Sequence, residues 1–204
     1  MSKTQETIEW YLGLVKQTID DLDRNEIEKA IEFFMDAYNN QNTIYIFGNG
    51  GSAASATHAC GDFLKGASFG LPKRFRVMSL VDNLPAMMAI ANDISYEEIF
   101  IEQLKNFLKP GDVVIGISGS GNSANVVKAM QYGIDNGARS IAFCGFKGGK
   151  IKEMADVIIH SKALDMEVAE DIHMMVFNVI KKEVMRRLHG ENPSMGDLYD
   201  KRVQ

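Results

Sequence analysis

The stretch IYIFGNGGSAASATHA, residues 44–59, decides the fold of this 204-residue chain. Residues 43–47 (TIYIF) are β-branched and aromatic, which is the composition of a buried strand. GNGGS at 48–52 predicts a tight turn, and the small residues that follow predict a helix over 53–65. Strand, glycine-rich turn and helix in this order are typical of a parallel α/β unit whose turn binds an anion.

Four further runs are apolar and short enough to be buried strands, and helical segments separate them. The predicted strands are 75–80, 113–118, 140–145 and 156–161, and the predicted helices are 6–22, 27–38, 84–108, 124–136 and 167–187. Because strands and helices alternate after the two opening helices, we expect a parallel sheet covered on both faces.

Composition limits the function classes. The chain is 46% apolar and carries 22 basic against 27 acidic side chains, a net charge of −5, without a cluster of basic residues. Disorder is excluded, and nucleic acid is not the expected partner. Cys60 and Cys144 fit neither a disulfide framework nor a metal motif, and no run is long enough to span a membrane. We expect a soluble, cytoplasmic protein that acts on small metabolites and contacts no membrane.

A second loop resembles the first in design. SGSGNS at 118–123 follows a strand and precedes a helix, and the hydroxyls of Ser118, Ser120 and Ser123 can turn toward one anion. Neither loop contains the lysine that nucleoside triphosphate sites use, which favours a singly phosphorylated small molecule. Both loops follow parallel strands, so they can share a pocket at the carboxyl edge of the sheet.

Two other interpretations of the loops remain open. The first loop can be a plain turn without a ligand. The spacing Gly48-x-Gly50-x-x-Ala53 is also a permitted variant of the dinucleotide fingerprint, for which Asp82 is the nearest acidic partner.

Candidate acid–base groups lie on two predicted helices. His58 and Asp62 are four residues apart and share a helix face, either as site residues or as a surface pair. Glu170 and Asn178 lie on one stripe of the last helix, whereas His173 lies about 60° around it and is interpreted as a core or interface residue. His160 is interpreted as structural. Locally, Asn92 and Asp93 indicate a turn and helix cap.

The chain resembles the sugar isomerase (SIS) domain family, and specifically its phosphoheptose isomerases. The resemblance rests on GNGGSAASATHACGD (48–62), AIAND (89–93), GDVVIGISGSGNSANVVKAM (111–130) and EDIHMMVFNVI (170–180), and it covers residues 5–188. It implies a flavodoxin-like, five-stranded α/β/α sandwich over residues 1–188, with 189–204 as a tail. It also implies a homotetramer with active sites between subunits, and the conversion of sedoheptulose 7-phosphate to glycero-manno-heptose 7-phosphate for surface polysaccharides.

The resemblance also implies site residues. Phosphate contacts would fall on Ser52, Ser118, Gly119, Ser120 and Ser123. Sugar contacts would fall on Asn49, Gly50, Gly51, Asn92 and Asp93, with Glu170 also at the substrate.

The chain departs from the family at its catalytic positions. The family has glutamate at the position of Asp62, glutamine at that of Glu170 and histidine at that of Asn178. We expect Asp62 to be the base of an aldose–ketose isomerisation through an enediol, with His58 or Glu170 moving protons between the oxygens. Alternatively, a zinc ion held by His58, Asp62 and Glu170 polarises the sugar oxygens. The other hypothesis is a phosphosugar-binding regulator without catalysis, a protein-binding tetramer that keeps the serine loops; Asn178 favours it.

Overall fold

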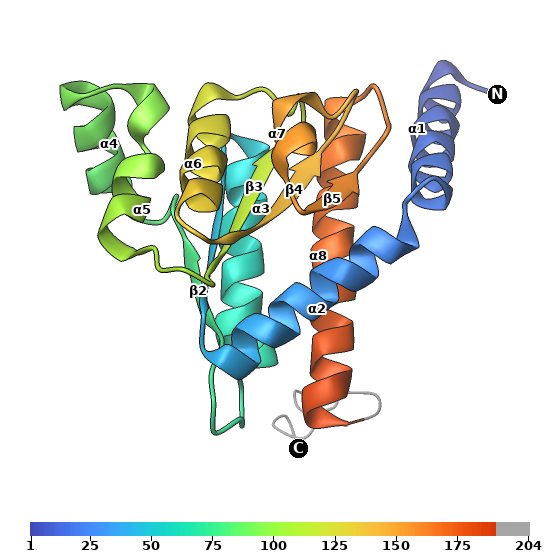
Figure 1. The fold of residues 1–204 in the computed structure, drawn as a ribbon. Coiled ribbons are helices and arrows are strands. Elements are labelled where there is room, and N and C mark those ends of the chain that lie inside the picture. The colour runs from blue at the N-terminus through green and yellow to red at the C-terminus, as the bar shows by residue number, and fades with distance from the viewer. Residues whose placement is uncertain (191–204) are drawn as a thin grey trace.

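The computed structural model describes residues 1–190. Its centre is a sheet of five parallel strands in the order β2-β1-β3-β4-β5, which is the flavodoxin-like order (Figure 1). The strands are β1 (Thr43–Gly48), β2 (Arg76–Ser79), β3 (Val113–Ser118), β4 (Arg139–Cys144) and β5 (Val157–His160). All five predicted strands are confirmed within one residue at each end.

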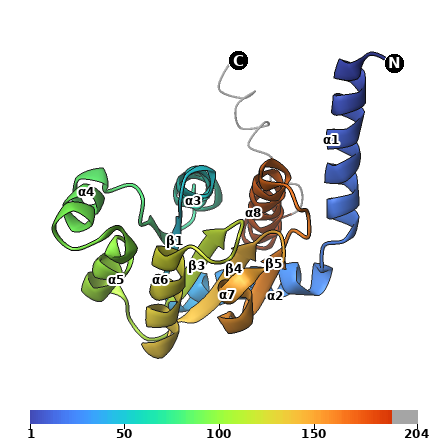
Figure 2. The same ribbon diagram turned by 90° about the horizontal axis from the view of Figure 1, so that it is seen from above.

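Helices cover both faces of the sheet, as the alternating sequence predicts. Side chains alternate along β1: Ile44 and Ile46 pack in one core, Tyr45 and Phe47 in the other. The first core is closed by α2 (Arg24–Asn40), α3 (Gly51–Gly61) and α8 (Met166–His189), and the second by α5 (Ile101–Phe107), α6 (Ala124–Asp135) and α7 (Gly149–Met154). Figure 2 shows α3 and α8 on one side of the strands and α6 and α7 on the other.

The first helix, α1 (Lys3–Asp20), stands at the margin of the molecule beside α8 (Figures 1 and 2). The Tyr11 hydroxyl donates a hydrogen bond of 2.7 Å to the Asp171 carboxylate on α8. Ile8, Trp10 and Leu12 remain about half exposed, at 51%, 57% and 48%. This apolar surface is available for contact with another chain.

One helical prediction is wrong in detail, and one short helix was not predicted. The segment 84–108 is not one helix but α4 (Leu84–Asp93), a 3₁₀ turn at Tyr96–Glu98 and α5. The break occurs because Ser95, with φ −171° and ψ 160°, is fully extended. Helix α7 was not predicted, because its six residues are too few to show a helical repeat.

The helix predicted over 53–65 changes character midway. α3 starts at Gly51, and at Asp62 it continues as a π-helix, η1 (Asp62–Ala67). Short π-helical segments of this kind are frequent at functional sites.

The last helix extends slightly beyond the expected domain end. α8 runs through His189, whose ring nitrogen lies 2.9 Å from the Ala67 carbonyl oxygen at the end of η1. The rest of the expected tail, from residue 191 on, lies outside the described residues. No helix within residues 1–190 combines the length and apolar content of a membrane span.

A buried carboxylate fixes the start of the central strands. Asp112, 3% exposed, accepts hydrogen bonds from the backbone N–H groups of Thr43 (2.7 Å) and Lys109 (2.8 Å). These two bonds tie β1 to the turn that precedes β3. The alignment of the two site-bearing strands therefore depends in part on Asp112.

Replacing Asp112 with alanine leaves both N–H groups without their acceptor. We expect the free energy of unfolding to fall by about 2–6 kcal/mol, at 1–3 kcal/mol for each donor left unsatisfied. Urea unfolding measures this, with the exposed Glu28→Ala as control. A loss no larger than that of the control would contradict the assignment.

Candidate active site

The two glycine–serine loops lie side by side because β1 and β3 are neighbours in the sheet. The register pairs Gly48 with Ile117, so both strands end at the same level. A Cβ on Gly48 would lie 2.7 Å from the Ile117 carbonyl oxygen and 2.8 Å from the Ser52 Cβ, closer than packing allows. Glycine at this position therefore lets Ser52, at the start of α3, pack close to the end of β3.

The hydroxyls of the second loop converge as expected. The Ser118 Oγ lies 3.5 Å from the Ser120 Oγ and 3.2 Å from the Ser123 Oγ. Gly121 has φ +67°, a conformation that favours glycine, and it turns the loop between them. Three hydroxyls beside the start of α6 form a cluster of donors suited to one tetrahedral anion.

An amide pair that the sequence analysis missed joins the two loops. Asn49 of the first loop and Asn125 of α6 exchange two hydrogen bonds, both 2.9 Å long, and Asn125 is 2% exposed. The Tyr96 hydroxyl donates to the same Asn49 oxygen at 2.9 Å. Asn49 is thus held in place by side chains from two later segments of the chain. A buried, paired amide gives no local sequence signal.

Glu170 lies at the first turn of α3. A Cβ on Gly51 would overlap the Glu170 carboxylate, so glycine makes room for this side chain. Burial, and to a lesser extent the nearby Glu167 and Asp171, raise the pKa of Glu170 above its usual value. The structure therefore brings Glu170 to the first loop, among the predicted sugar contacts Gly50 and Gly51.

The pair His58 and Asp62 lies at the other end of α3. His58 Nε2 is 3.7 Å from one oxygen of Asp62, and the other oxygen accepts a 2.6 Å hydrogen bond from the Lys181 ammonium on α8. Lys181 and Asp62 are largely shielded, with side chains 17% and 22% exposed. Lys181 was not predictable from local sequence, because its partner Asp62 is more than a hundred residues away.

The three expected zinc ligands do not come together within one chain. Lys181 holds Asp62, and about three helical turns, roughly 16 Å, separate Lys181 from Glu170 along α8. In the part of the chain that the structure describes, no three His, Cys, Asp or Glu side chains are grouped to hold a metal ion. The donor set His58, Asp62 and Glu170 does not fit a zinc site in this arrangement.

Asn92 and Asp93 close α4, as the cap signal predicts. The Asn92 amide donates to the Asp93 carboxylate at 2.7 Å, and both side chains are exposed. Tyr96, a few residues later, contacts Asn49 and so brings this segment to the first loop.

The dinucleotide interpretation finds no support in the fold. The strand order differs from the 3-2-1-4-5-6 order of the dinucleotide fold. Asp82 accepts a 2.7 Å hydrogen bond from the Thr57 hydroxyl on α3.

The two histidines interpreted as non-catalytic have structural surroundings. His173 is fully buried, packs edge-on against Phe143 and lies 3.1 Å from the Cys144 carbonyl oxygen. Burial lowers the pKa of His173 to about 4. His160 lies 3.0 Å from the Phe146 carbonyl oxygen, and burial lowers its pKa as well. Both rings act as parts of the packing around β4 and β5.

A lysine near the second loop also escaped the sequence analysis. Lys147, in the loop between β4 and α7, lines a cavity of about 390 Å³ together with Ser120, Asn122, Phe146 and Met166, among others. It provides a cation near a loop that has none of its own. Nothing in the local sequence links residue 147 to residue 120.

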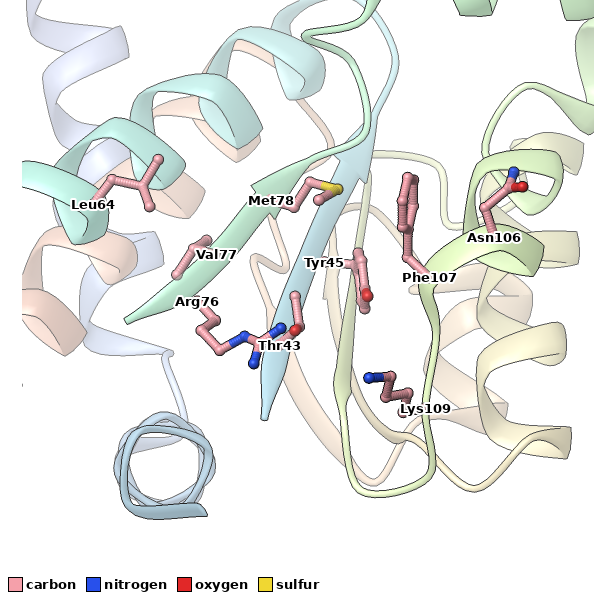
Figure 3. A pocket seen from close by; sticks show the side chains of 9 residues that line it. All are labelled: Thr43, Tyr45, Leu64, Arg76, Val77, Met78, Asn106, Phe107 and Lys109. Atoms are coloured by element: carbon pink, nitrogen blue, oxygen red, sulfur yellow. The ribbon is translucent and has the colours of Figure 1, made fainter. Parts of the chain in front are cut away.

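A separate groove of about 360 Å³ lies where the strands begin (Figure 3). Thr43 and Arg76, the first residues of β1 and β2, line it together with Tyr45, Phe107 and Lys109. None of the residues selected from the sequence borders this groove. It is therefore distinct from the edge that carries the two loops.

Comparison with known proteins agrees with this architecture. The model of the SIS domain family matches residues 11–145. A relative from Thermoplasma volcanium, named "Probable phosphoheptose isomerase", is 37% identical over 78% of this chain and 81% of its own. The phosphoheptose isomerase of Geotalea daltonii is 35% identical over 81% and 86%. The solved phosphoheptose isomerase from Neisseria gonorrhoeae superposes with a TM-score of 0.82 at 26% identity, over 89% of this chain and 98% of that one.

The chain therefore belongs to the SIS domain family, in its phosphoheptose isomerase subfamily.

The amide pair between the loops can be tested by a double-mutant cycle. We expect Asn49→Ala and Asn125→Ala to be non-additive, with a coupling of about 1–3 kcal/mol for two buried hydrogen bonds. Urea unfolding of both single variants and the double variant gives this number. The pair Asn49→Ala and Gln131→Ala, with Gln131 exposed on α6, should be additive within about 0.5 kcal/mol. Equal coupling in both cycles would refute the link.

Proposed function

We propose that the protein isomerises a phosphorylated ketose to its aldose, with sedoheptulose 7-phosphate as substrate and D-glycero-D-manno-heptose 7-phosphate as product, for surface polysaccharide synthesis. One observation carries the proposal: the convergence of Ser118, Ser120 and Ser123 next to the first loop, in a chain of this subfamily. Loops that can bind one phosphate group and contain no lysine suit a sugar monophosphate as ligand. The acid–base groups on α3 and α8 supply the chemistry.

The phosphate would bind at the edge formed by the two loops. The proposed hydrogen-bond donors to the phosphate are Ser52, Ser118, Ser120, Ser123 and the backbone of Gly119. Lys147, on the wall of the adjoining cavity, would offset part of the charge of the dianion. The proposed contacts of the sugar are Asn49, Gly50, Gly51, Asn92, Asp93 and Glu170.

The proposed reaction is a proton transfer. Asp62 removes the proton next to the carbonyl, an enediol forms, and the proton returns to the neighbouring carbon. His58, exposed beside Asp62, or Glu170, whose pKa is raised by burial, exchanges protons with the sugar oxygens. Asn178 cannot take this part, since an amide neither gives nor accepts a proton at neutral pH.

The site is proposed to be shared between subunits of a homotetramer. Ten residues of helix separate Ser52 from Asp62, a rise of about 15 Å. This exceeds the length of a heptose phosphate, for which about 10 Å separates the phosphorus from C1 when the carbon chain is extended. A phosphate loop from one subunit and an acid–base pair from another can meet on one substrate. The exposed apolar side chains of α1 support an assembly.

The remaining proposals concern metal, domain and compartment. No step of the proposed reaction passes through zinc, because His58, Asp62 and Glu170 are not grouped to hold a metal ion in the described part of one chain. Residues 1–188 are proposed to be one SIS domain. The two buried, free thiols of Cys60 and Cys144 fit a reducing compartment, so we place the protein in the cytoplasm.

Asn178 favours a second candidate function. A chain that keeps the serine loops but has lost a proton-transferring side chain suits a phosphosugar-binding regulator. Such a protein would bind the sugar phosphate and a protein partner without turnover.

Incubation with sedoheptulose 7-phosphate tests the proposal directly. We expect the aldose product to accumulate, at a similar rate with and without added zinc. Binding without product, measured by calorimetry, would refute the isomerase and support the regulator. Strict dependence on zinc would overturn the metal-free reaction.

The role of Asp62 predicts a loss of turnover. Asp62→Asn keeps the shape of the side chain but removes the base, so kcat should fall by about 100-fold or more. Far-ultraviolet circular dichroism checks that the fold is intact. Near-normal turnover would remove the assignment.

The serine loop predicts a loss of phosphate recognition. Replacing both Ser120 and Ser123 with alanine should raise the Kd for sedoheptulose 7-phosphate by about 10-fold or more, because two hydrogen bonds to a charged group are lost. Sedoheptulose without phosphate should bind equally poorly to both proteins. An unchanged Kd for the phosphorylated sugar would contradict the assignment.

A further inference from the structure

Lys181 makes a short contact with the proposed base. Its ammonium lies 2.6 Å from one oxygen of Asp62, and both side chains are largely shielded from water. The second Asp62 oxygen is on the side of His58, at 3.7 Å from Nε2. The carboxylate is thus held at one oxygen and left open at the other.

The backbone of η1 is shaped for this lysine. η1 begins at Asp62, and Gly66 lies one turn further on. A Cβ at Gly66 would lie 3.0 Å from the Lys181 Cε and 3.3 Å from its Nζ. Glycine therefore leaves room for the lysine stem to pass along the helix and reach Asp62.

We propose that Lys181 is a positioning residue for the isomerisation: it holds Asp62 through Oδ1 and leaves Oδ2 as the oxygen that takes the substrate proton. The inference rests on the proposed function and deepens it. It also offers a reason why this chain tolerates Asn178, since Lys181 places a cation one helical turn further along α8.

The charge balance of the proton transfer gives the ammonium a second effect. The C–H bond next to the carbonyl breaks, its proton moves to Asp62, its electron pair forms the new C=C bond, and the carbonyl π pair moves to oxygen. Asp62 becomes neutral and the substrate oxygen becomes negative, while Lys181 remains positive. The cation that paired with the carboxylate then stabilises the enediolate. A proton then moves from the neighbouring hydroxyl to this oxygen through His58 or Glu170, so that the new carbonyl can form at the other carbon. Return of the first proton from Asp62 to the adjacent carbon restores the starting ion pair, so no oxidant or reductant is needed.

Three variants test this role against a purely structural one. We expect Lys181→Met to lower kcat by about 10- to 100-fold with KM changed by less than about threefold, because the ammonium acts on the transition state. Lys181→Arg should recover part of the loss. Lys182→Met, an equal loss of charge at the exposed neighbour, should match the parent protein.

Non-additivity shows whether Lys181 acts through Asp62. The double variant Asp62→Asn, Lys181→Met should lose clearly less turnover than the product of the two single losses, because Lys181 acts mainly through Asp62. A loss equal to that product would overturn the positioning role.

Chemical restoration covers the case in which Lys181→Met folds poorly. Lys181→Cys, alkylated after folding with 2-bromoethylamine, regains an ammonium at the same reach, and kcat should rise at least fivefold; the parent, whose Cys60 and Cys144 are buried, serves as control. If the parent protein is active, two results would each overturn this inference alone. One is a kcat of Lys181→Met within twofold of the parent, and the other is an alkylated Lys181→Cys whose kcat does not rise. A parent without any turnover overturns the proposed function, and the inference with it.

Discussion

The pairing of β1 with β3 is the constraint on which the rest of the site depends. The two strands are separated in sequence by β2 and by α3, α4 and α5, yet their register sets Gly48 opposite Ile117. Both glycine–serine loops therefore start from the same level at the carboxyl edge. The Asn49–Asn125 amide pair then locks one loop to the other. A shift of one residue in this register would separate the hydroxyls from the first turn of α3.

The strands were predictable from sequence because a buried parallel strand is a continuous apolar run with polar or glycine-rich ends. The strand order was not evident from the runs themselves and came from the family resemblance. The helix over 84–108 was wrong because the apolar periodicity continues through Ile94 and Ile99 although Ser95 is extended. Helix α7 was missed because one and a half turns carry no periodic signal.

The site was predictable only where its chemistry is local. The serines at 118, 120 and 123 lie in one loop, so their convergence follows from the loop itself. Asn125 and Lys147 were missed because the groups they meet belong to other segments. The same holds for Lys181, which approaches Asp62 because α8 and α3 pack against each other. The expected grouping of His58, Asp62 and Glu170 was wrong for a related reason. Residues on two packed helices come into contact only when they lie at the same position along the helix axes, and the sequence does not give this position.

The two carboxylates of the proposed site differ in surroundings in a way that suits opposite tasks. Burial and the acidic neighbours Glu167 and Asp171 raise the pKa of Glu170, and a phosphate dianion bound nearby would act in the same direction. Glu170 is therefore suited to carry a proton and give it to a sugar oxygen. Asp62 instead has the Lys181 ammonium 2.6 Å from one oxygen, which holds the carboxylate in place for the role of base. The two acids therefore have opposite neighbours, a lysine beside Asp62 and two acidic side chains near Glu170, and these neighbours suit them to different tasks in a proton-transfer reaction.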